Sequence, residues 1–424
     1  MKVLVIGGGG REHALVRCIQ NSPLLSEICC APGNGGIAAQ GVRCLPIKVG
    51  ETTRIVEVAR KESFDLVVVG PDNPLAAGLV DKLEAAGIPA FGPTKSAARL
   101  ESSKAFSKGL MSRYGIPTAE YKVFEDTMDA TRYLRELKTW PVVVKADGLA
   151  LGKGVVVAQN LEQAEKFVNS VMRDKVFGGA GSRVVIEQHI SGPEVSLLAF
   201  CDGKTVVPMV SAMDYKRAFD GNQGQNTGGM GAIAPNPYYT GQIHTQVMDK
   251  IVSPTLDALN AEGITFKGCI YFGLMLTDDG PMVIEYNARF GDPETQAVLP
   301  LLESDILEIM LACREGRLDS TMVRFSDKYS ACLVLASGGY PLKHPTAMPI
   351  SGLFPNGQSR QGKGVVYHAG TRLDDNGEFY TSGGRVLGLS ATGKTLREAV
   401  ETVYTMGKAI TFPGEFYRTD IGKL

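Results

Sequence analysis

The sequence predicts an α/β protein of three domains: an N-terminal doubly wound parallel sheet, a central α/β domain and a mostly β C-terminal domain. The first hundred residues alternate continuously apolar runs with helical patterns, which is typical of strands buried on both faces of a parallel sheet. The pattern changes to a helical connector near residue 100 and to strands and loops near residue 326. The 424 residues therefore divide into the domains 1–100, 101–325 and 326–424, which have ordinary domain sizes.

The elements of the first domain follow from the spacing of its apolar residues. Continuous short runs predict strands, and apolar residues recurring every three or four positions predict helices. The expected strands are Val3–Ile6, Ile28–Cys30, Leu66–Val69 and Ile88–Phe91. The expected helices are Glu12–Gln20, Ile55–Lys61 and Leu75–Ala86.

The second domain opens with the helical connector Ser96–Tyr114 and continues with alternating strands and helices. The expected strands are Tyr121–Phe124, Val142–Lys145, Val155–Ala158 and Arg183–Glu187, and the expected helices are Asp126–Leu137 and Glu162–Val176. Asp-Gly turns after Cys201 and after Thr277 predict two β-hairpins. The Gly-, Asn- and Gln-rich stretch Phe219–Pro237 predicts a long functional loop. In the third domain we expect a strand at Leu333–Ala336 and a late helix at Leu396–Ile410.

Composition and charge exclude several kinds of partner. The formal net charge of −1 argues against nucleic-acid binding, which relies on excess positive charge. No apolar run approaches the ~18 residues of a membrane helix, and no signal-peptide pattern is present, so we expect a cytoplasmic chain with no membrane partner. Eight cysteines without a Cys-x-x-Cys pair predict free, buried thiols. Five scattered histidines form no zinc pattern, so any metal should be oxygen-bound Mg²⁺ or Mn²⁺.

A glycine-rich run, Gly7–His13, follows the first strand and opens a helix. Backbone N–H groups and the helix dipole make this position of an α/β sheet suitable for phosphate. The dinucleotide pattern G-x-G-x-x-G fails here, yet NAD(P) binding and a tight turn without a ligand both remain as alternatives. Small polar loops also follow the strands that end before Pro32 and Gly70. Three such loops at one sheet edge favour a crevice for a phosphorylated small molecule.

A lysine, a glycine-rich turn and a Glu-x-Asn pair form a second constellation. Lys145 ends a strand and is followed by the turn Gly148–Gly154, so that its ammonium and the backbone N–H groups can hold phosphates. Taken alone, a solvated lysine beside a flexible hairpin is the alternative. The turn is not a Walker A loop, because Gly154 stands where Ser or Thr is required. In a strand ending at Asn287, alternation places Glu285 and Asn287 on one face, where their oxygens suit Mg²⁺. A surface strand with salt bridges is the alternative for this pair alone, and the combination with the lysine and the glycine-rich turn favours the metal site.

Eight short motifs along the chain resemble the glycinamide ribonucleotide synthetase (phosphoribosylamine–glycine ligase) family of the ATP-grasp superfamily. They occur in the family's order from residue 1 to about residue 390, so the resemblance covers essentially the whole chain. The motifs are Gly9–Ala14, Ala31–Asn34, Ser103–Phe106, Lys145–Ala150, Asn226–Gly231, Arg289–Gln296, His368–Thr371 and Gly383–Leu387. The resemblance implies that the central domain is a two-lobe ATP-grasp domain, with a small mobile lobe at about 120–190.

The resemblance also implies the nucleotide and metal ligands. Lys104 and Lys145 match the ATP-phosphate lysines, with Lys145 also catalytic, and Glu285 and Asn287 match the Mg²⁺ (or Mn²⁺) ligands. The remaining ATP contacts implied are the mobile turn Gly152, Lys153 and Gly154, the adenine-side residues Glu187, Gln188 and Ile190, and the ribose ligand Glu194. For Lys104 and Glu187, an ordinary surface lysine and a strand-end charge are the alternatives. No acidic residue lies in Phe272–Leu276, so we expect one well-held Mg²⁺ and a second held mostly by the nucleotide.

The reaction implied is ATP-dependent ligation of glycine to 5-phosphoribosylamine through glycyl phosphate. Arg289 would bind the glycyl carboxylate or the transferring phosphoryl group, and Asp292 the ammonium of glycine; both are expected to be catalytic. Substrate contacts are also implied for Gly10, Arg11, Asn34, Asp72, Asp214, Lys216, Arg217 and Gly229. A plain salt-bridge cluster is the alternative for the Asp214–Arg217 segment.

Two positions depart from the family's pattern without changing the polarity of the site: Asp72 replaces an expected Glu, and Tyr215 replaces a frequent His. The competing hypotheses are a sister ATP-grasp ligase that uses bicarbonate or formate, an NAD(P) oxidoreductase and a non-enzymatic nucleotide-binding regulator. We expect a monomer, because the charge is near neutral and no heptad seam is present. The pathway implied, purine biosynthesis, would allow transient contact with neighbouring pathway enzymes.

Overall fold

The computed structural model describes residues 1–150 and 153–423. Its N-terminal domain is a five-stranded parallel sheet in the order β3-β2-β1-β4-β5, so the chain winds outward in both directions from β1. This is the predicted doubly wound sheet, and its strands are almost wholly buried. The strands are β1 (Lys2–Gly7), β2 (Glu27–Pro32), β3 (Arg43–Cys44), β4 (Leu66–Val69) and β5 (Ala90–Phe91). The helices are α1 (Gly10–Gln20), α2 (Gly35–Ala39), α3 (Thr52–Lys61), α4 (Asp72–Ala76) and α5 (Leu79–Ala85).

Two helices predicted as continuous are each divided in the structure. The expected helix Leu75–Ala86 is interrupted at Gly78, whose φ of +79° is left-handed and ends α4 before α5 begins. The expected connector Ser96–Tyr114 is interrupted at Ser103, which has an extended backbone and caps the second helix by accepting the N–H of Phe106 at 3.2 Å. The resulting helices are α6 (Lys95–Ser102) and α7 (Lys104–Arg113).

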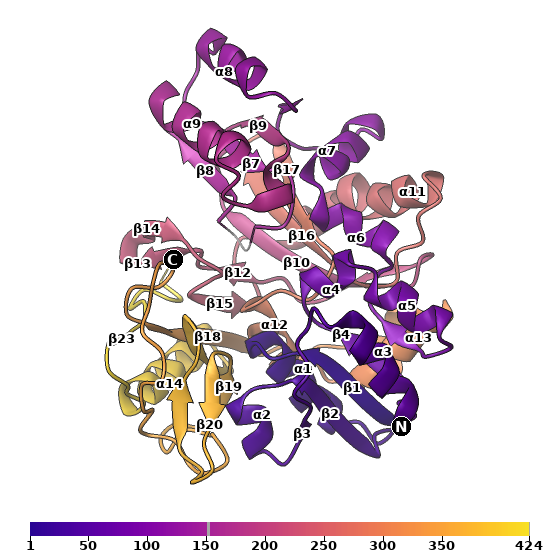
Figure 1. Ribbon diagram of the computed structural model, residues 1–424, viewed down its shortest axis with the longest axis vertical. Helices are drawn as coiled ribbons and strands as arrows, with labels where there is room; N and C mark the ends of the chain where they lie inside the picture. The colour runs from indigo at the N-terminus through magenta and orange to yellow at the C-terminus, as the bar shows by residue number, and fades with distance from the viewer. Residues whose placement is uncertain (151–152, 424) are drawn as a thin grey trace.

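The central domain contains two antiparallel sheets. The first, at the top of Figure 1, has the order β6-β9-β7-β8 and is covered by α8 and α9. Its elements are β6 (Tyr121–Phe124), α8 (Thr127–Glu136), β7 (Val142–Ala146), β8 (Val155–Ala158), α9 (Leu161–Val168) and β9 (Val184–Gln188). The predicted helix Glu162–Val176 is observed as α9 continued by a π-helical turn at Asn169–Arg173, so it ends at Arg173 and not at Val176.

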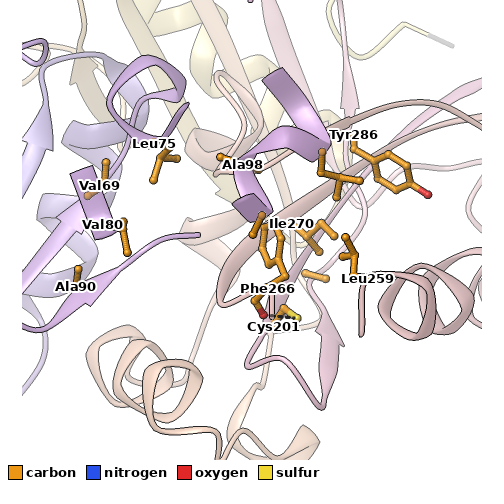
Figure 2. Packing of buried hydrophobic residues seen from close by; sticks show 14 of the residues in the cluster. Val69, Leu75, Val80, Ala90, Ala98, Cys201, Leu259, Phe266, Ile270 and Tyr286 are labelled. Atoms are coloured by element: carbon orange, nitrogen blue, oxygen red, sulfur yellow. Dashed lines mark hydrogen bonds between the residues drawn. The ribbon is translucent and has the colours of Figure 1, made fainter. Parts of the chain in front are cut away.

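The second sheet has the order β11-β10-β16-β17, and both predicted hairpins are present in it. Its strands are β10 (Glu194–Cys201), β11 (Val206–Pro208), β16 (Gly268–Thr277) and β17 (Gly280–Asn287). The associated helices are α10 (Gly241–Val247), α11 (Ser253–Ala261), α12 (Glu294–Val298) and α13 (Ile306–Glu315). One apolar core joins this sheet to the N-terminal domain: in Figure 2, Ala98 of α6 lies between Val69 and Leu75 on one side and Phe266 and Ile270 on the other. This core contains residues from one face of the parallel sheet, in β1, β2, β4 and β5, and is continuous with residues of the central domain.

The third sheet combines strands from two of the predicted domains. Its order is β12-β15-β18-β22-β19, with β23 beside β18. The C-terminal elements are β18 (Tyr329–Ser337), β19 (Val365–His368), β20 (Thr371–Leu373), β21 (Phe379–Thr381), β22 (Arg385–Gly393), α14 (Leu396–Ala409) and β23 (Glu415–Phe416). β12 (Met213–Asp214) and β15 (Gly231–Ala234) come from segment 101–325, and β15 pairs directly with β18.

The prediction of one long loop over Phe219–Pro237 is therefore wrong in part. β13 (Arg217–Phe219) and β14 (Gln223–Asn226) form a hairpin, and β15 follows it. The polar composition concealed these strands, because β14 is an exposed hairpin strand and needs no apolar alternation.

The N- and C-terminal domains meet around two buried histidines. The backbone N–H of His368 donates to Nδ1 of His13 at 2.8 Å, and the amide of Asn34 donates to the carbonyl oxygen of His368 at 2.7 Å. Burial lowers the pKa of His368 to about 4, so the ring is neutral in this contact. All eight cysteines are free thiols, as predicted; six are buried, whereas Cys18 and Cys44 are half-buried. Among the helices of the described residues, none has the length and apolar character that a membrane crossing requires.

Candidate functional site

Lys145 and Glu187 lie on the same face of the β6–β9 sheet, because β7 and β9 pair with Val143 opposite Glu187. The ammonium of Lys145 is 2.9 Å from Oε1 of Glu187, and it donates to the carbonyl oxygen of Ile284 at 3.0 Å. The second contact joins the small sheet to β17 of the large one. Lys145 is 3 % exposed, so its charge is held in a largely desolvated place between the two sheets.

Lys104 is brought beside this site by the loop after β7. The carboxylate of Asp147 accepts the N–H of Ala105 at 2.7 Å and the guanidinium of Arg183, which ties the loop to the start of α7. Lys104 then donates to the carbonyl oxygen of Gly148 at 3.1 Å. Burial, opposed by the nearby carboxylate of Glu285, lowers the pKa of Lys104. The two predicted phosphate lysines therefore converge on one place.

The glycine-rich turn is described only in part, because Gly152 lies outside the described residues. Lys153 is exposed, and the carbonyl oxygen of Gly154 accepts the N–H of Ala146 at 2.8 Å, which closes the turn against β7. Gly148 has no room for a side chain, since a Cβ there would lie 2.6 Å from that of Ala180. Close packing thus explains part of the glycine content.

Glu285 and Asn287 share one face of β17, because they pair with Gly273 and Tyr271 of β16. The amide oxygen of Asn287 accepts from Arg289 at 3.3 Å. Burial favours the neutral form of Glu285, but Lys216, Lys145, Lys104 and Arg289 together lower its pKa. A carboxylate and an amide oxygen are ligands that suit a divalent cation, and the cationic side chains near them suit phosphates. No group of three His, Cys, Asp or Glu side chains arranged for a metal occurs in residues 1–150 and 153–423.

Arg289 is held by a buried carboxylate that the sequence reasoning missed. Its guanidinium is 2.9 Å from Glu101 of α6, and Glu101 also accepts the N–H of Ala288 at 2.8 Å. Although burial opposes the charge, Glu101 and then Asp72 raise the pKa of Arg289 above its usual range. No local pattern in α6 distinguishes Glu101, so only the tertiary contact identifies it.

Asp292 lies where the three domains meet. Its carboxylate accepts from Gln296 at 2.8 Å and is 3.4 Å from the guanidinium of Arg385 in the C-terminal domain. Burial disfavours its charged form, but Arg385 and Arg11 lower the pKa of Asp292. Arg385 belongs to one of the sequence motifs, yet the sequence alone assigned it no role.

The predicted substrate residues of the N-terminal domain border the same region. Arg11 donates to the carbonyl oxygen of Phe290 at 3.1 Å, and a Cβ on Gly10 would lie 2.4 Å from the amide of Gln296. Asn34 caps α2 by accepting the N–H of Ile37, and the carboxylate of Asp72 accepts the N–H of Asn73. In the glycine run, the carboxylate of Glu12 accepts the N–H of Gly9 at 2.7 Å, so the protein's own side chain occupies that donor.

The remaining predicted residues are only partly brought together. Lys216 is 2.8 Å from Glu194 and 4.0 Å from Glu285. Burial and neighbouring carboxylates raise the pKa of Asp214 to about 7, despite the opposing charge of Lys216. Arg217 lies apart from this group and donates to the carbonyl oxygen of Gly224 within the β13–β14 hairpin.

Gln188 is the last residue of β9, and Ile190 lies in the loop that follows. The backbone N–H of Gln188 donates to the carbonyl oxygen of Glu120 at 2.9 Å, and Ile190 is half-buried. Their backbone positions therefore border the small sheet beside Glu187.

Gly229 packs tightly against the Asp292–Pro293 turn. Its φ of +107° is unfavourable for other residues, and a Cβ would lie 2.3 Å from Cδ of Pro293. We expect Gly229→Ala to destabilise the fold by about 1–3 kcal/mol through backbone strain and overpacking. The control is Gly241→Ala, because a Cβ on Gly241 meets nothing within 4 Å. Equal denaturation midpoints for the two variants would contradict this account of the turn.

Comparison with known proteins identifies the family. Models for the N domain, the ATP-grasp (A) domain and the C domain of phosphoribosylglycinamide synthetase match residues 1–101, 102–295 and 330–424. The chain is 46% identical over 422 residues to "Phosphoribosylamine--glycine ligase" of Caldanaerobacter subterraneus, covering 99% of each chain. It is also 46% identical over 423 residues to "Trifunctional purine biosynthetic protein adenosine-3" of Gallus gallus, of which it covers 42%.

Solved structures agree with this grouping. The crystal structure of phosphoribosylamine–glycine ligase from Thermotoga maritima has a TM-score of 0.84, 32% identity and complete coverage of both chains. Biotin carboxylase from Campylobacter jejuni has a TM-score of 0.75 at 15% identity, covering 98% of this chain and 92% of its own, and shares the fold. The three-domain architecture with a central ATP-grasp domain is therefore that of the relatives. The chain belongs to the phosphoribosylglycinamide synthetase family.

Proposed function

We propose that this protein ligates glycine to 5-phosphoribosylamine, with glycyl phosphate as intermediate, and forms glycinamide ribonucleotide, ADP and phosphate in de novo purine biosynthesis. The observation that carries the chemistry is the gathering of cations along the end of β17: Lys216 is 4.0 Å from Glu285, Lys145 donates to Ile284 and Arg289 donates to Asn287. Lys104 is near enough for Glu285 to affect its pKa. Phosphoryl transfer needs charge neutralisation and positioning more than covalent help from the protein. Full-length identity of 46% to a phosphoribosylamine–glycine ligase supports the choice of substrates.

In the first step, a carboxylate oxygen of glycine bonds to the γ-phosphorus of ATP, and the bond from that phosphorus to ADP breaks. Lys104 and Lys145 are proposed to hold the phosphates, and Arg289 to hold the carboxylate or the phosphoryl group in transfer. Glu285 and Asn287 would hold Mg²⁺ or Mn²⁺, which would neutralise phosphate charge when bound. The further ATP contacts proposed are those of the glycine turn (Gly152, Lys153, Gly154), the β9 end (Glu187, Gln188, Ile190) and Glu194.

In the second step, the amine of phosphoribosylamine bonds to the acyl carbon, a proton leaves the nitrogen, and phosphate departs. We propose that Asp292 receives the ammonium of glycine, because two arginines keep its carboxylate charged. Asp214, Lys216 and Arg217 are proposed for a substrate amine and phosphate. The N-terminal edge, with Gly10, Arg11, Asn34 and Asp72, is proposed to face phosphoribosylamine together with Gly229.

The wider setting is also a proposal. We take 1–100, 101–325 and 326–424 as functional units, with 120–190 moving over the nucleotide. We propose a monomeric, cytoplasmic enzyme. Transient contacts with pathway neighbours are also proposed, because one relative, of which this chain covers 42%, is a trifunctional purine biosynthetic protein.

The test is ADP release with ATP, Mg²⁺ and phosphoribosylamine generated from ribose 5-phosphate and ammonia. We expect release that depends on glycine and equals the glycinamide ribonucleotide formed. Release that responds instead to bicarbonate or formate would move the chain to the sister ligases. ATP binding without turnover for any acceptor would favour a regulator.

A further inference from the structure

Lys108 is a buried lysine one helical turn after Lys104, so both leave the same side of α7. Its ammonium donates to Oγ1 of Thr118 at 2.7 Å and is 2.9 Å from Oε2 of Glu187. The ring of Tyr121 in β6 lies 5.7 Å away from the same ammonium. The side chain of Lys108 is 2 % exposed, so these protein groups, and not water, surround its charge.

Glu187 is shared between two lysines. Oε1 is 2.9 Å from Lys145 and Oε2 is 3.0 Å from it, while Oε2 is also 2.9 Å from Lys108. One carboxylate therefore faces two ammonium groups, and the group of three carries one excess positive charge. A buried charge without a partner is costly. The excess positive charge here therefore indicates that an anion binds beside these lysines.

Charged and polar groups from three strands and from the segment before β6 face the ammonium of Lys108. Glu187 lies on β9, Lys145 on β7 and Tyr121 on β6, and Thr118 precedes β6. Burial, only partly opposed by Glu187, lowers the pKa of Lys108 to about 8. The excess charge is therefore present at neutral pH and is lost above it.

We propose that Lys108 is a positioning residue for ATP, which acts through Glu187 to keep the ammonium of Lys145 available to phosphate. Without the charge of Lys108, Glu187 and Lys145 form a neutral one-to-one pair, and Lys145 attracts phosphate less. Lys108 itself touches neither of the proposed metal ligands. The role of Lys108 rests on the ATP site of the proposed function, and Lys108 lies outside all eight sequence motifs.

The test measures ATP affinity directly, by calorimetric titration of the intact protein with MgATP in the absence of glycine. We expect Lys108→Met to weaken ATP binding by about tenfold, as removal of one nearby charge at intermediate dielectric does. Wild-type affinity should fall as the pH rises through about 8, because Lys108 loses its proton there. The part of that decrease centred near pH 8 should be missing in Lys108→Met, whereas any loss of the Lys104 proton, whose pKa burial also lowers, is common to both proteins. Lys108→Arg, which keeps its charge, should bind ATP nearly as the wild type does at pH 7 and also lack the decrease.

The exposed Lys166→Met on α9 is the matched control and should retain both the affinity and its pH dependence. A merely structural role would lower the denaturation midpoint but leave the pH profile of folded protein unchanged. Wild-type affinity in Lys108→Met would overturn the proposal, as would weaker binding with the same decrease above pH 8. If Lys108→Met does not fold, Lys108→Arg alone decides between these outcomes. Failure of glycine-dependent ADP release with intact ATP binding would count against the ligase assignment only.

Discussion

Replacement of Lys145 by methionine should lower kcat for glycine-dependent ADP release by roughly 10²–10³, the usual effect of removing one pre-placed electrostatic stabiliser. Methionine retains an unbranched apolar stem of similar length, so the packing between β7 and β9 should persist. The charge that bridges Glu187 and the carbonyl oxygen of Ile284 is lost, and with it the ammonium proposed to face the transferring phosphate. Steady-state kcat and KM for ATP provide the measurement.

The matched control for this change is Lys138→Met, because Lys138 is exposed beyond α8. It should leave kcat unchanged. Denaturation midpoints of both variants separate a catalytic loss from a folding defect. If folded Lys145→Met turned over at the wild-type rate, Lys145 would have to be removed from the phosphate site.

Replacement of Glu285 by glutamine should raise the Mg²⁺ concentration at half-maximal rate by about 10- to 100-fold, the scale at which altered metal surroundings act. The amide keeps the size of the side chain but removes the charge that Lys216, Lys145, Lys104 and Arg289 stabilise. Saturating Mg²⁺ should restore part of the rate. The exposed Glu303→Gln is the control, and a magnesium titration identical to that of the wild type would remove Glu285 from the metal site.

Continuous apolar runs and Asp-Gly turns in the sequence correctly predicted strands and hairpins. The continuous run Leu66–Val69 is observed as β4 with the same bounds, and the Asp-Gly turns form both hairpins. Single residues with special backbone conformations were harder to anticipate, since Gly78 and Ser103 each divide a helix whose apolar spacing continues through them. Pairing between distant segments was not predictable: β15 joins β18 across about a hundred residues of sequence.

In the candidate site, too, features set by local geometry were predictable and contacts between distant segments were not. The Glu285–Asn287 alternation depends only on strand geometry, and the structure has it. The partners of Arg289 and Lys145 depend on tertiary contacts, so Glu101 and Lys108 were missed. Lys108 had one usable signal, because it lies four residues after Lys104 and so on the same face of a helix. For Glu187, a position beside adenine was expected, and the carboxylate is found between two lysines.

The central claim, that ATP activates the carboxylate of glycine, is tested most directly with glycine labelled with ¹⁸O in both carboxylate oxygens. The ligation is run with ATP, Mg²⁺ and phosphoribosylamine, and the phosphate and glycinamide ribonucleotide are analysed by mass. The account predicts one ¹⁸O in each phosphate and one in each product amide, because the oxygen that bonds to phosphorus leaves with it. Unlabelled phosphate formed together with ligated product would contradict a glycyl phosphate.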